Sequence, residues 1–88
     1  MKLLWTSHAW EEYLFWQQND PKTLNRINEL LKECTRTPFQ GTGKPEALKG
    51  DLKGWWSRRI NHEDRLVYRV RGERNTQQIE IAQCRYHY

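Results

Sequence analysis

The stretch RLVYRVR, residues 65–71, sets the expected fold, because apolar and basic side chains alternate along it as in a half-buried β-strand. One face of this strand carries the apolar side chains of Leu66, Tyr68 and Val70. The opposite face carries Val67 together with Arg65, Arg69 and Arg71. We expect the first face to pack against helices and the second to present its arginines to solvent. The segment predicts an α+β protein with one basic sheet face.

Turn residues on both sides of this strand predict a small, mainly antiparallel sheet. The turn at residues 61–64 connects it to a preceding strand at residues 55–60, and the turn that begins at Gly72 leads on to a strand at residues 78–86. Near the start of the chain, residues 2–5 form a short apolar stretch that fits one further strand. The pattern therefore predicts a four-stranded sheet.

Two helices are predicted between the first strand and the rest of the sheet. Thr6 or Ser7 can cap the first helix, along which Trp10, Tyr13 and Leu14 follow helical spacing. Asp20 and Pro21 form a start signal for the second helix. Its apolar stripe consists of Leu24, Ile27, Leu30, Leu31 and Cys34, and Pro38 stops it. We expect a helical hairpin packed on one face of the sheet.

The length and the charge of the chain limit the classes of protein to which it can belong. The 88 residues predict a single domain, residues 1–88. The net charge of +4 lies entirely in residues 44–88, where ten basic residues accompany six acidic ones. No apolar run reaches the length of a membrane span, no secretory leader is visible, and Cys34 and Cys84 are too few for a disulfide scaffold. We expect a cytoplasmic protein with no membrane contact. The basic second half of the chain is expected to bind an anionic partner.

A long connection, residues 37–54, is rich in glycine and contains Glu46 and Lys49. Connections of this length are uncommon in small domains unless they carry function. Metal-free cleavage of RNA needs a base for the 2′-hydroxyl, cations for the pentavalent phosphate and an acid for the leaving 5′-oxygen. The polar residues able to supply these groups on the basic face are Glu46, Lys49, Arg59, Arg65, His87 and Tyr88. This chemistry uses no cofactor, and the carboxylates beside His8 and His62 lack the count and spacing of a metal site.

Three sets of motifs point to one family. They are RTPF (residues 36–39) with GTGKPEALK (41–49), WSRRI (56–60) with RLVY (65–68), and CRYHY (84–88). Together they resemble the YoeB-type toxins, the Txe/YoeB family of the RelE superfamily, over essentially the whole chain. The terminal Arg-Tyr-His-Tyr is the most diagnostic part. One departure is the turn at residues 72–78, which is a few residues longer than the family's usual hairpin and bears on ribosome or antitoxin contacts rather than on chemistry.

The resemblance implies a RelE-like fold and a ribosome-dependent endoribonuclease, or mRNA interferase, of a bacterial type II toxin–antitoxin pair. Such a toxin cleaves mRNA in the ribosomal A site without a metal and so inhibits translation. The implied partners are the 70S ribosome with its mRNA, a cognate YefM-type antitoxin and, in a homodimer, a second copy. The implied roles are general base for Glu46, general acid for His87, phosphorane stabilisation for Arg65, phosphate binding for Lys49 and Arg59, and orientation or base stacking for Tyr88 and its terminal carboxylate.

Each of these residues also has a structural interpretation. Arg65 would pair with Glu63 or Asp64 across the turn, and Arg59 with Glu80, while Glu46 would be an ordinary exposed loop carboxylate. A basic strand face is most often a solvated one. The alternative function is therefore a non-catalytic basic module that binds RNA or an acidic protein. The adjacent Trp55 and Trp56 point to opposite faces, so one belongs to the core and the other is free to contact a base or the antitoxin.

Overall fold

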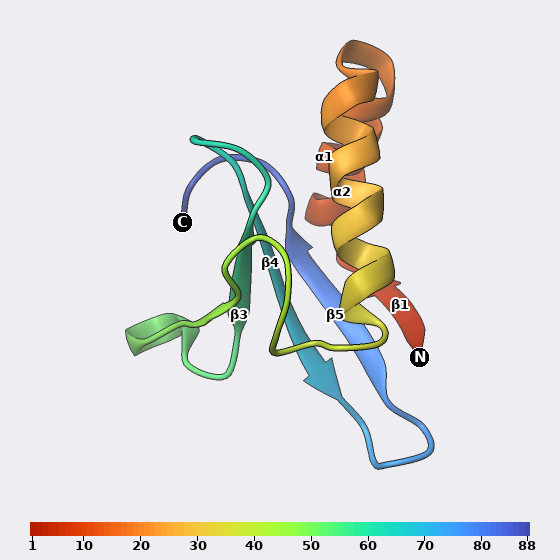
Figure 1. Ribbon diagram of the computed structural model, residues 1–88, viewed down its shortest axis with the longest axis vertical. Coiled ribbons are helices and arrows are strands. Elements are labelled where there is room, and N and C mark those ends of the chain that lie inside the picture. Colours follow the sequence, from red (N-terminus) through yellow and green to blue (C-terminus); the bar gives the residue numbers. More distant parts are fainter.

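Two helices cover one face of a five-stranded sheet in the computed structural model, which describes residues 1–88 (Figure 1). In chain order the elements are β1 (Lys2–Trp5), α1 (Ser7–Asn19), α2 (Pro21–Cys34), β2 (Glu46–Ala47), a short 3₁₀ helix (Gly50–Leu52), β3 (Trp56–Arg59), β4 (Arg65–Arg71) and β5 (Gln78–Gln83). The strands lie in the order β1-β5-β4-β3-β2. The predicted α+β fold, with its helical hairpin on one sheet face, is confirmed.

The fifth strand was not anticipated. It is the two-residue β2 at the sheet edge, where Glu46 lies opposite Ser57 and Ala47 opposite Trp56. The glycine-rich connection thus joins the sheet instead of passing over it. All pairings are antiparallel except that of β1 with β5.

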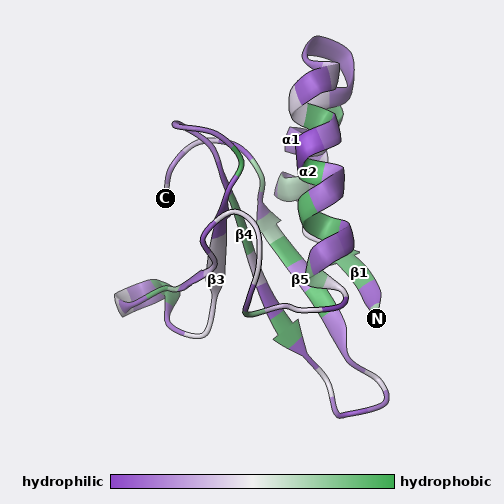
Figure 2. Ribbon diagram, in the orientation of Figure 1, coloured by the Kyte–Doolittle hydropathy of each residue, from purple (hydrophilic) through white to green (hydrophobic).

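The sheet places the core where strand parity predicted it. Leu66 and Tyr68 of β4 are fully buried beside Ile79 and Ile81 of β5. The helices contribute Ile27, Leu30, Leu31 and Cys34 from α2 and Ala9 and Trp16 from α1 to the same core. Figure 2 shows the apolar residues of β4 and β5 along the strands that the helices approach. Neither helix combines the length and the apolar character needed to cross a membrane.

The helix starts follow the predicted caps. The Thr6 hydroxyl accepts a hydrogen bond from the Ala9 N–H at 3.1 Å and begins α1. The Asp20 carboxylate accepts the Thr23 N–H at 3.1 Å, and Pro21 occupies the first helical position of α2. The Thr23 hydroxyl and N–H hold the pKa of Asp20 below its usual range. Both signals are therefore local, which is why the sequence located them correctly.

The buried face of α1 differs from the predicted stripe. Ala9, Glu12 and Trp16 are buried, whereas Trp10 is 45% exposed. Trp10 instead stacks on Tyr13, with 5.7 Å between ring centroids. The small Ala9 side chain lets the helix pack closely on the sheet, a contact that a tryptophan at the same place would prevent. Trp10 and Tyr13 consequently lie beside the helix–sheet contact, whereas Trp16 takes part in it.

Candidate active site

The sheet face opposite the helices carries a row of four side chains, three of them polar. Glu46, Ser57, Val67 and Gln83 lie directly opposite one another in β2, β3, β4 and β5. Residues that face each other across paired strands project to the same side of a sheet. Two residues further along β3, Arg59 lies opposite Arg65 of β4 and shares this face. The structure thus brings Glu46, Arg59 and Arg65 onto one surface.

The C-terminal tail, residues 84–88, crosses this surface. Its path runs from the end of β5 across β4 towards β3 (Figure 1). The Tyr86 carbonyl accepts a hydrogen bond from the Arg65 N–H at 3.0 Å, and the Tyr88 hydroxyl lies 3.2 Å from the Ser57 hydroxyl. Because Ser57 is the direct neighbour of Glu46, the tail places Tyr88 next to the strand that carries the proposed base.

The turn of the tail occurs at Tyr86. Its φ of +67° lies in the left-handed region, which costs a residue with a side chain about 1–2 kcal/mol. β5 itself ends at Gln83, where its pairing with β4 ends, before the predicted end at residue 86. The Gln83 side-chain amide donates to the carbonyls of Arg85 and Tyr86 and supports the bend.

His87 is exposed, and its ring lies against that of Tyr88 with 4.7 Å between centroids. Its Nδ1 is 3.0 Å from the Tyr88 main-chain oxygen. That oxygen can only accept a hydrogen bond, so a bond between the two atoms requires Nδ1–H as the donor and leaves Nε2 as the nitrogen available to a substrate.

Arg65 is buried rather than solvent-facing, with 8% exposure, which corrects the prediction made from strand parity. Its Nη1 donates to the carbonyls of Asn61 at 2.7 Å, Asp64 at 3.0 Å and His62 at 3.3 Å. The predicted alternative, an ion pair with Glu63 or Asp64, is absent among the ion pairs of the structure. Nη1 is the donor in all three bonds. The turn therefore fixes the guanidinium and leaves its other nitrogens for a ligand.

Glu46, Lys49 and Arg59 are exposed, and none of them takes part in an ion pair. The alternative pairing of Arg59 with Glu80 is wrong. Glu80 instead pairs with Arg69 at 2.8 Å and with Arg71 at 3.5 Å. Lys49 immediately precedes the 3₁₀ helix, beyond the end of β2. These exposed groups are free to contact an anion.

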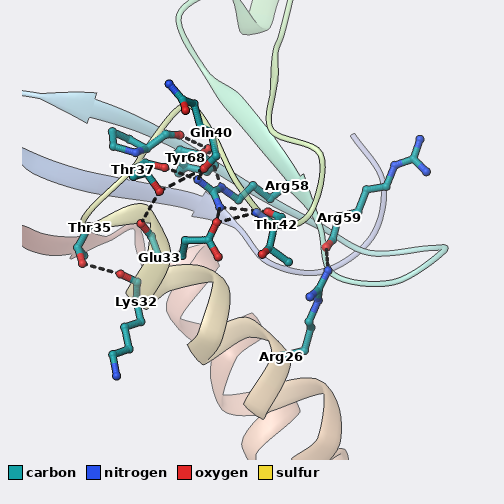
Figure 3. A network of polar contacts seen from close by, with 11 residues as sticks. Arg26, Lys32, Glu33, Thr35, Thr37, Gln40, Thr42, Arg58, Arg59 and Tyr68 are labelled. Atoms are coloured by element: carbon teal, nitrogen blue, oxygen red, sulfur yellow. Dashed lines mark hydrogen bonds and ion pairs between the residues drawn. The ribbon is translucent and has the colours of Figure 1, made fainter.

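Sequence reasoning missed Arg58, which anchors the glycine-rich connection (Figure 3). Its side chain is fully buried, and Nη2 donates to the carbonyls of Thr37 and Gln40 at 2.5 and 2.7 Å. Its Nη1 donates to the Thr42 carbonyl and to the Glu33 carboxylate, both at 3.1 Å. Alternation along WSRRI contained the signal, because it places Arg58 on the helix-covered face between two residues of the basic face.

The same network extends to Tyr68 and Glu33. The Arg58 Nε donates to the Tyr68 hydroxyl at 3.1 Å, and that hydroxyl donates to the Pro38 carbonyl. Burial raises the pKa of Tyr68 to about 12, so the hydroxyl stays protonated. A Cβ on Gly41, whose φ is +111°, would lie 1.6 Å from a Glu33 oxygen. The connection that leads to Glu46 is therefore held from the core.

The other residues singled out in the sequence are structural. Trp56 packs against the core and against Phe39, whereas Trp55 lies on the other face with the Arg69 guanidinium 4.3 Å from its ring centroid. Cys34 and Cys84 are buried free thiols. Burial raises the pKa of Cys84 to about 12, which excludes it as a nucleophile near neutral pH.

Comparison with known families agrees with this geometry. Residues 5–88 match the model of the YoeB-like toxin of bacterial type II toxin–antitoxin systems. The chain belongs to the YoeB-like toxin family. Toxin YoeB of Escherichia coli K12 is 52% identical over 88 residues, which cover 100% of both chains. The family membership and the predicted toxin class are thereby confirmed.

Solved structures place the fold in the same family. A YoeB/ParE toxin from Agrobacterium tumefaciens is 53% identical, covers 100% of both chains and superposes with a TM-score of 0.96. From Staphylococcus aureus, a YoeB dimer (48% identity, TM-score 0.88) and a heterotetrameric YoeB–YefM complex (49%, TM-score 0.87) each match 100% of this chain and 98% of the other. The RelBE2 complex of Mycobacterium tuberculosis, at 20% identity and a TM-score of 0.71, shows the RelE-like fold alone.

Proposed function

We propose that this toxin is a ribosome-dependent endoribonuclease that acts in the cytoplasm and cleaves mRNA in the ribosomal A site, which inhibits translation. The observation that carries the proposal is the path of the tail. It runs over the sheet face that carries Glu46, Arg59 and Arg65, with the Tyr88 hydroxyl 3.2 Å from Ser57. This path supports a site in which Glu46 acts as the base, His87 as the acid and the arginines as the cations. Family membership supports the same assignment.

In this mechanism Glu46 removes the proton from a 2′-hydroxyl, and the resulting oxygen attacks the adjacent phosphorus. The 2′-oxygen–phosphorus bond forms as the phosphorus–5′-oxygen bond breaks. In this step His87 acts as the imidazolium, which carries a proton on both ring nitrogens, and it gives the Nε2 proton to the leaving 5′-oxygen. Arg65 stabilises the added negative charge of the pentavalent phosphate, while Lys49 and Arg59 bind phosphate oxygens. Tyr88 orients the site or stacks on a base. No step requires a metal.

The open character of the site supports ribosome dependence. Glu46 and His87 are exposed, and neither lines a surface hollow of the protein. The toxin alone therefore offers no pocket that would hold an RNA in line for attack. Holding reacting groups in a productive geometry is worth about 7–11 kcal/mol of the barrier. On this proposal the ribosome supplies that contribution by presenting the message.

Cleavage of a defined message with and without 70S ribosomes tests the proposal. We expect the parent to cleave only with ribosomes, and Glu46→Ala and His87→Ala to lose about 10²–10⁴-fold in rate each while still sedimenting with ribosomes. Glu29→Ala, which removes an exposed carboxylate on α2, and His62→Ala serve as matched controls and should cleave normally. Equal behaviour of all variants, with ribosome binding retained, would favour the non-catalytic RNA- or protein-binding module instead.

We also propose a YefM-type antitoxin as the inhibitory partner, supported by the Staphylococcus aureus YoeB–YefM complex. An acidic segment that covers Arg59 and Lys49 would neutralise exposed cations that have no internal partner. In competition, such a segment should displace the toxin from ribosomes, and this effect should weaken in Lys49→Ala and Arg59→Ala. An antitoxin that binds both variants with unchanged affinity would place its contacts elsewhere.

A homodimer is proposed on the apolar surface at the side of the helical hairpin. A groove of about 440 Å³ includes Leu3, Trp5, Trp10, Tyr13 and Leu31, and Leu3 and Trp10 are 40% and 45% exposed. The YoeB dimer of Staphylococcus aureus supports a second copy as its occupant. Sedimentation should show a dimer for the parent and a monomer for Leu3→Glu, with Glu11→Ala as the unaffected control. A parent that stays monomeric at high concentration contradicts this assignment.

A further inference from the structure

The tail that carries His87 and Tyr88 runs beyond the backbone pairing of the sheet. β1 follows β5 only as far as Ile81, whose carbonyl accepts the Thr6 N–H at 3.0 Å before the chain turns into α1. β4 begins at Arg65, where its own N–H donates to the Tyr86 carbonyl. The N–H groups of Cys84 and Tyr86 therefore have no strand carbonyl to bind, and side chains must satisfy them.

Glu12 of α1 satisfies the first of these groups. Its Oε1 accepts the Cys84 N–H at 2.9 Å, and Trp16, one helical turn further, donates Nε1–H to the Cys84 carbonyl at 2.9 Å. Glu12 is only 6% exposed, and its Oε2 makes no hydrogen bond although the His8 Nε2 lies 3.3 Å away. A buried carboxylate with an incomplete set of hydrogen bonds is costly, and packing alone would be served better by an apolar residue.

Asp64 satisfies the second group from the other side. Its Oδ1 accepts the Tyr86 N–H at 2.6 Å, and the residue is 7% exposed. The turn that presents it is closed by its own bonds, because Asn61 Oδ1 accepts the Asp64 N–H at 2.8 Å and the Asp64 carbonyl accepts the Ile60 N–H at 3.0 Å. The carboxylate is thus a fixed acceptor at the residue where the tail bends with positive φ.

We propose that Glu12 and Asp64 are positioning residues, which clamp the tail from opposite sides through the N–H groups of Cys84 and Tyr86 and so hold His87 and Tyr88 over the sheet face. This assignment rests on the proposed nuclease function, since it concerns the alignment of the proposed acid. Neither carboxylate reaches the reacting atoms in the mechanism above. Their contribution is that of hydrogen-bond acceptors, for which the neutral side chains of Gln and Asn are adequate substitutes.

Amide hydrogen exchange tests the clamp without reference to activity. In the full chain, Glu12→Ala should accelerate exchange of the Cys84 N–H at least about tenfold, and Asp64→Ala should do the same for the Tyr86 N–H. Exchange of core amides such as those of Tyr68 and Ile81 should stay unchanged, which shows that the variants remain folded. Glu12→Gln and Asp64→Asn keep an acceptor and should exchange like the parent. Unchanged tail exchange in both alanine variants overturns the clamp.

Single-turnover cleavage on saturating ribosomes tests the consequence for catalysis. Misplacement of a reacting group by about 1 Å costs roughly 10²-fold in rate. We therefore expect both alanine variants to lose about 10–100-fold in rate with unchanged ribosome affinity, and Glu12→Gln and Asp64→Asn to recover to within about threefold. Glu11→Ala and Glu63→Ala, which are exposed neighbours of the same charge, serve as controls.

The two experiments separate the possible failures. If the parent itself does not cleave any message, the proposed function fails, while hydrogen exchange still reports whether the carboxylates hold the tail. If the parent cleaves and the alanine variants release the tail without loss of rate, the positioning role is overturned although the nuclease stands. A loss that Gln and Asn fail to recover would show that charge, rather than hydrogen bonding, is what matters, and would also overturn the proposal.

Discussion

Two irregular segments of this toxin carry its proposed acid and base, and they are held in opposite ways. The loop between α2 and β2, residues 35–45, leads to Glu46. It is anchored by the buried guanidinium of Arg58, which donates to loop carbonyls. The tail, residues 84–88, leads to His87 and is held by the carboxylates of Glu12 and Asp64, which accept tail N–H groups. One anchor is a single arginine in the core network, and the other consists of one carboxylate on α1 and one in the turn between β3 and β4.

Because of this difference, we expect one anchor to matter mainly for the stability of the fold and the other mainly for the position of His87. The Arg58 network joins α2, the loop, β3 and β4, so its loss leaves several polar groups unpaired inside the protein. The tail anchors each serve one N–H group beyond the last strand pairing. We therefore expect damage to the loop anchor to appear mainly as a loss of folding free energy, and damage to the tail anchors mainly as a loss of rate.

The largest expected effect is that of Arg58→Ala. The substitution removes the guanidinium that donates to the Tyr68 hydroxyl, to Glu33 and to the carbonyls of Thr37, Gln40 and Thr42. A single buried group left without its hydrogen bond costs about 1–3 kcal/mol, so the loss of several bonds at once should exceed the effect of any other substitution considered below. Urea unfolding should show this loss. Arg59→Ala, the neighbouring arginine with an exposed side chain, should change stability by no more than about 0.5 kcal/mol. Similar losses in both variants would show that Arg58 is not a special anchor.

Tyr68→Phe is expected to have a smaller effect on the same region. It removes the hydroxyl that donates to the Pro38 carbonyl and accepts from the Arg58 Nε, which leaves buried groups unsatisfied at a cost of about 1–3 kcal/mol. Tyr13→Phe removes a solvent-exposed hydroxyl bonded to Asn28 and should cost about 0.5 kcal/mol or less. Exchange of the Tyr86 amide should be unaffected in both variants. If Tyr68→Phe also released the tail, the two anchors would not be independent.

Local features of this fold could be predicted from the sequence, whereas the Arg58 anchor could not. Helix starts at Thr6 and Asp20 and the buried face of β4 follow from local patterns, and the structure confirms them. The loop anchor depends on a single arginine whose partners lie between 10 and 25 residues away in sequence. Alternation along WSRRI puts Arg58 and the exposed Arg59 on opposite faces, but this signal was missed in the sequence. The carbonyls and the carboxylate that Arg58 binds become visible only in three dimensions.

Arg65 shows the complementary limit of parity. Alternation placed its side chain correctly on the face opposite the helices, yet predicted it to be solvent-facing. The residue is buried because the turn at residues 61–64 folds over it and supplies three carbonyls. Alternation assigns a face, whereas burial also depends on the loops that cover that face. The roles of Glu46, Arg65 and His87 therefore remain proposals that the structure makes geometrically coherent.

The smallest expected effect is a difference in pH dependence between the two carboxylates at the anchors. The Thr42 N–H, together with Arg58, holds the pKa of Glu33 below its usual value of 4.5. Burial raises the pKa of Glu12 above 4.5, against the opposing influence of the Cys84 N–H and the charges of His8 and Arg85. The stability from Glu33 is therefore present above pH 4.5 and lost as pH falls through its folded pKa. That from Glu12 is fully present below pH 4.5 and lost as pH rises through its folded pKa.

Unfolding free energies of Glu33→Gln and Glu12→Gln, measured against the parent from about pH 3 to about pH 8, make this difference testable. The advantage of the parent over Glu33→Gln should shrink as the solution becomes more acidic, because both forms then carry a neutral side chain at this position. The advantage of the parent over Glu12→Gln should instead shrink as pH rises, because the parent must then bury a charge that the variant lacks. Repeating both comparisons in a His8→Gln background removes the imidazole that lies 3.3 Å from the Glu12 carboxylate. Slopes of the same sign for the two carboxylates would mean that loop and tail are held by the same kind of contact, and the distinction between the Arg58 anchor and the tail clamp would be lost.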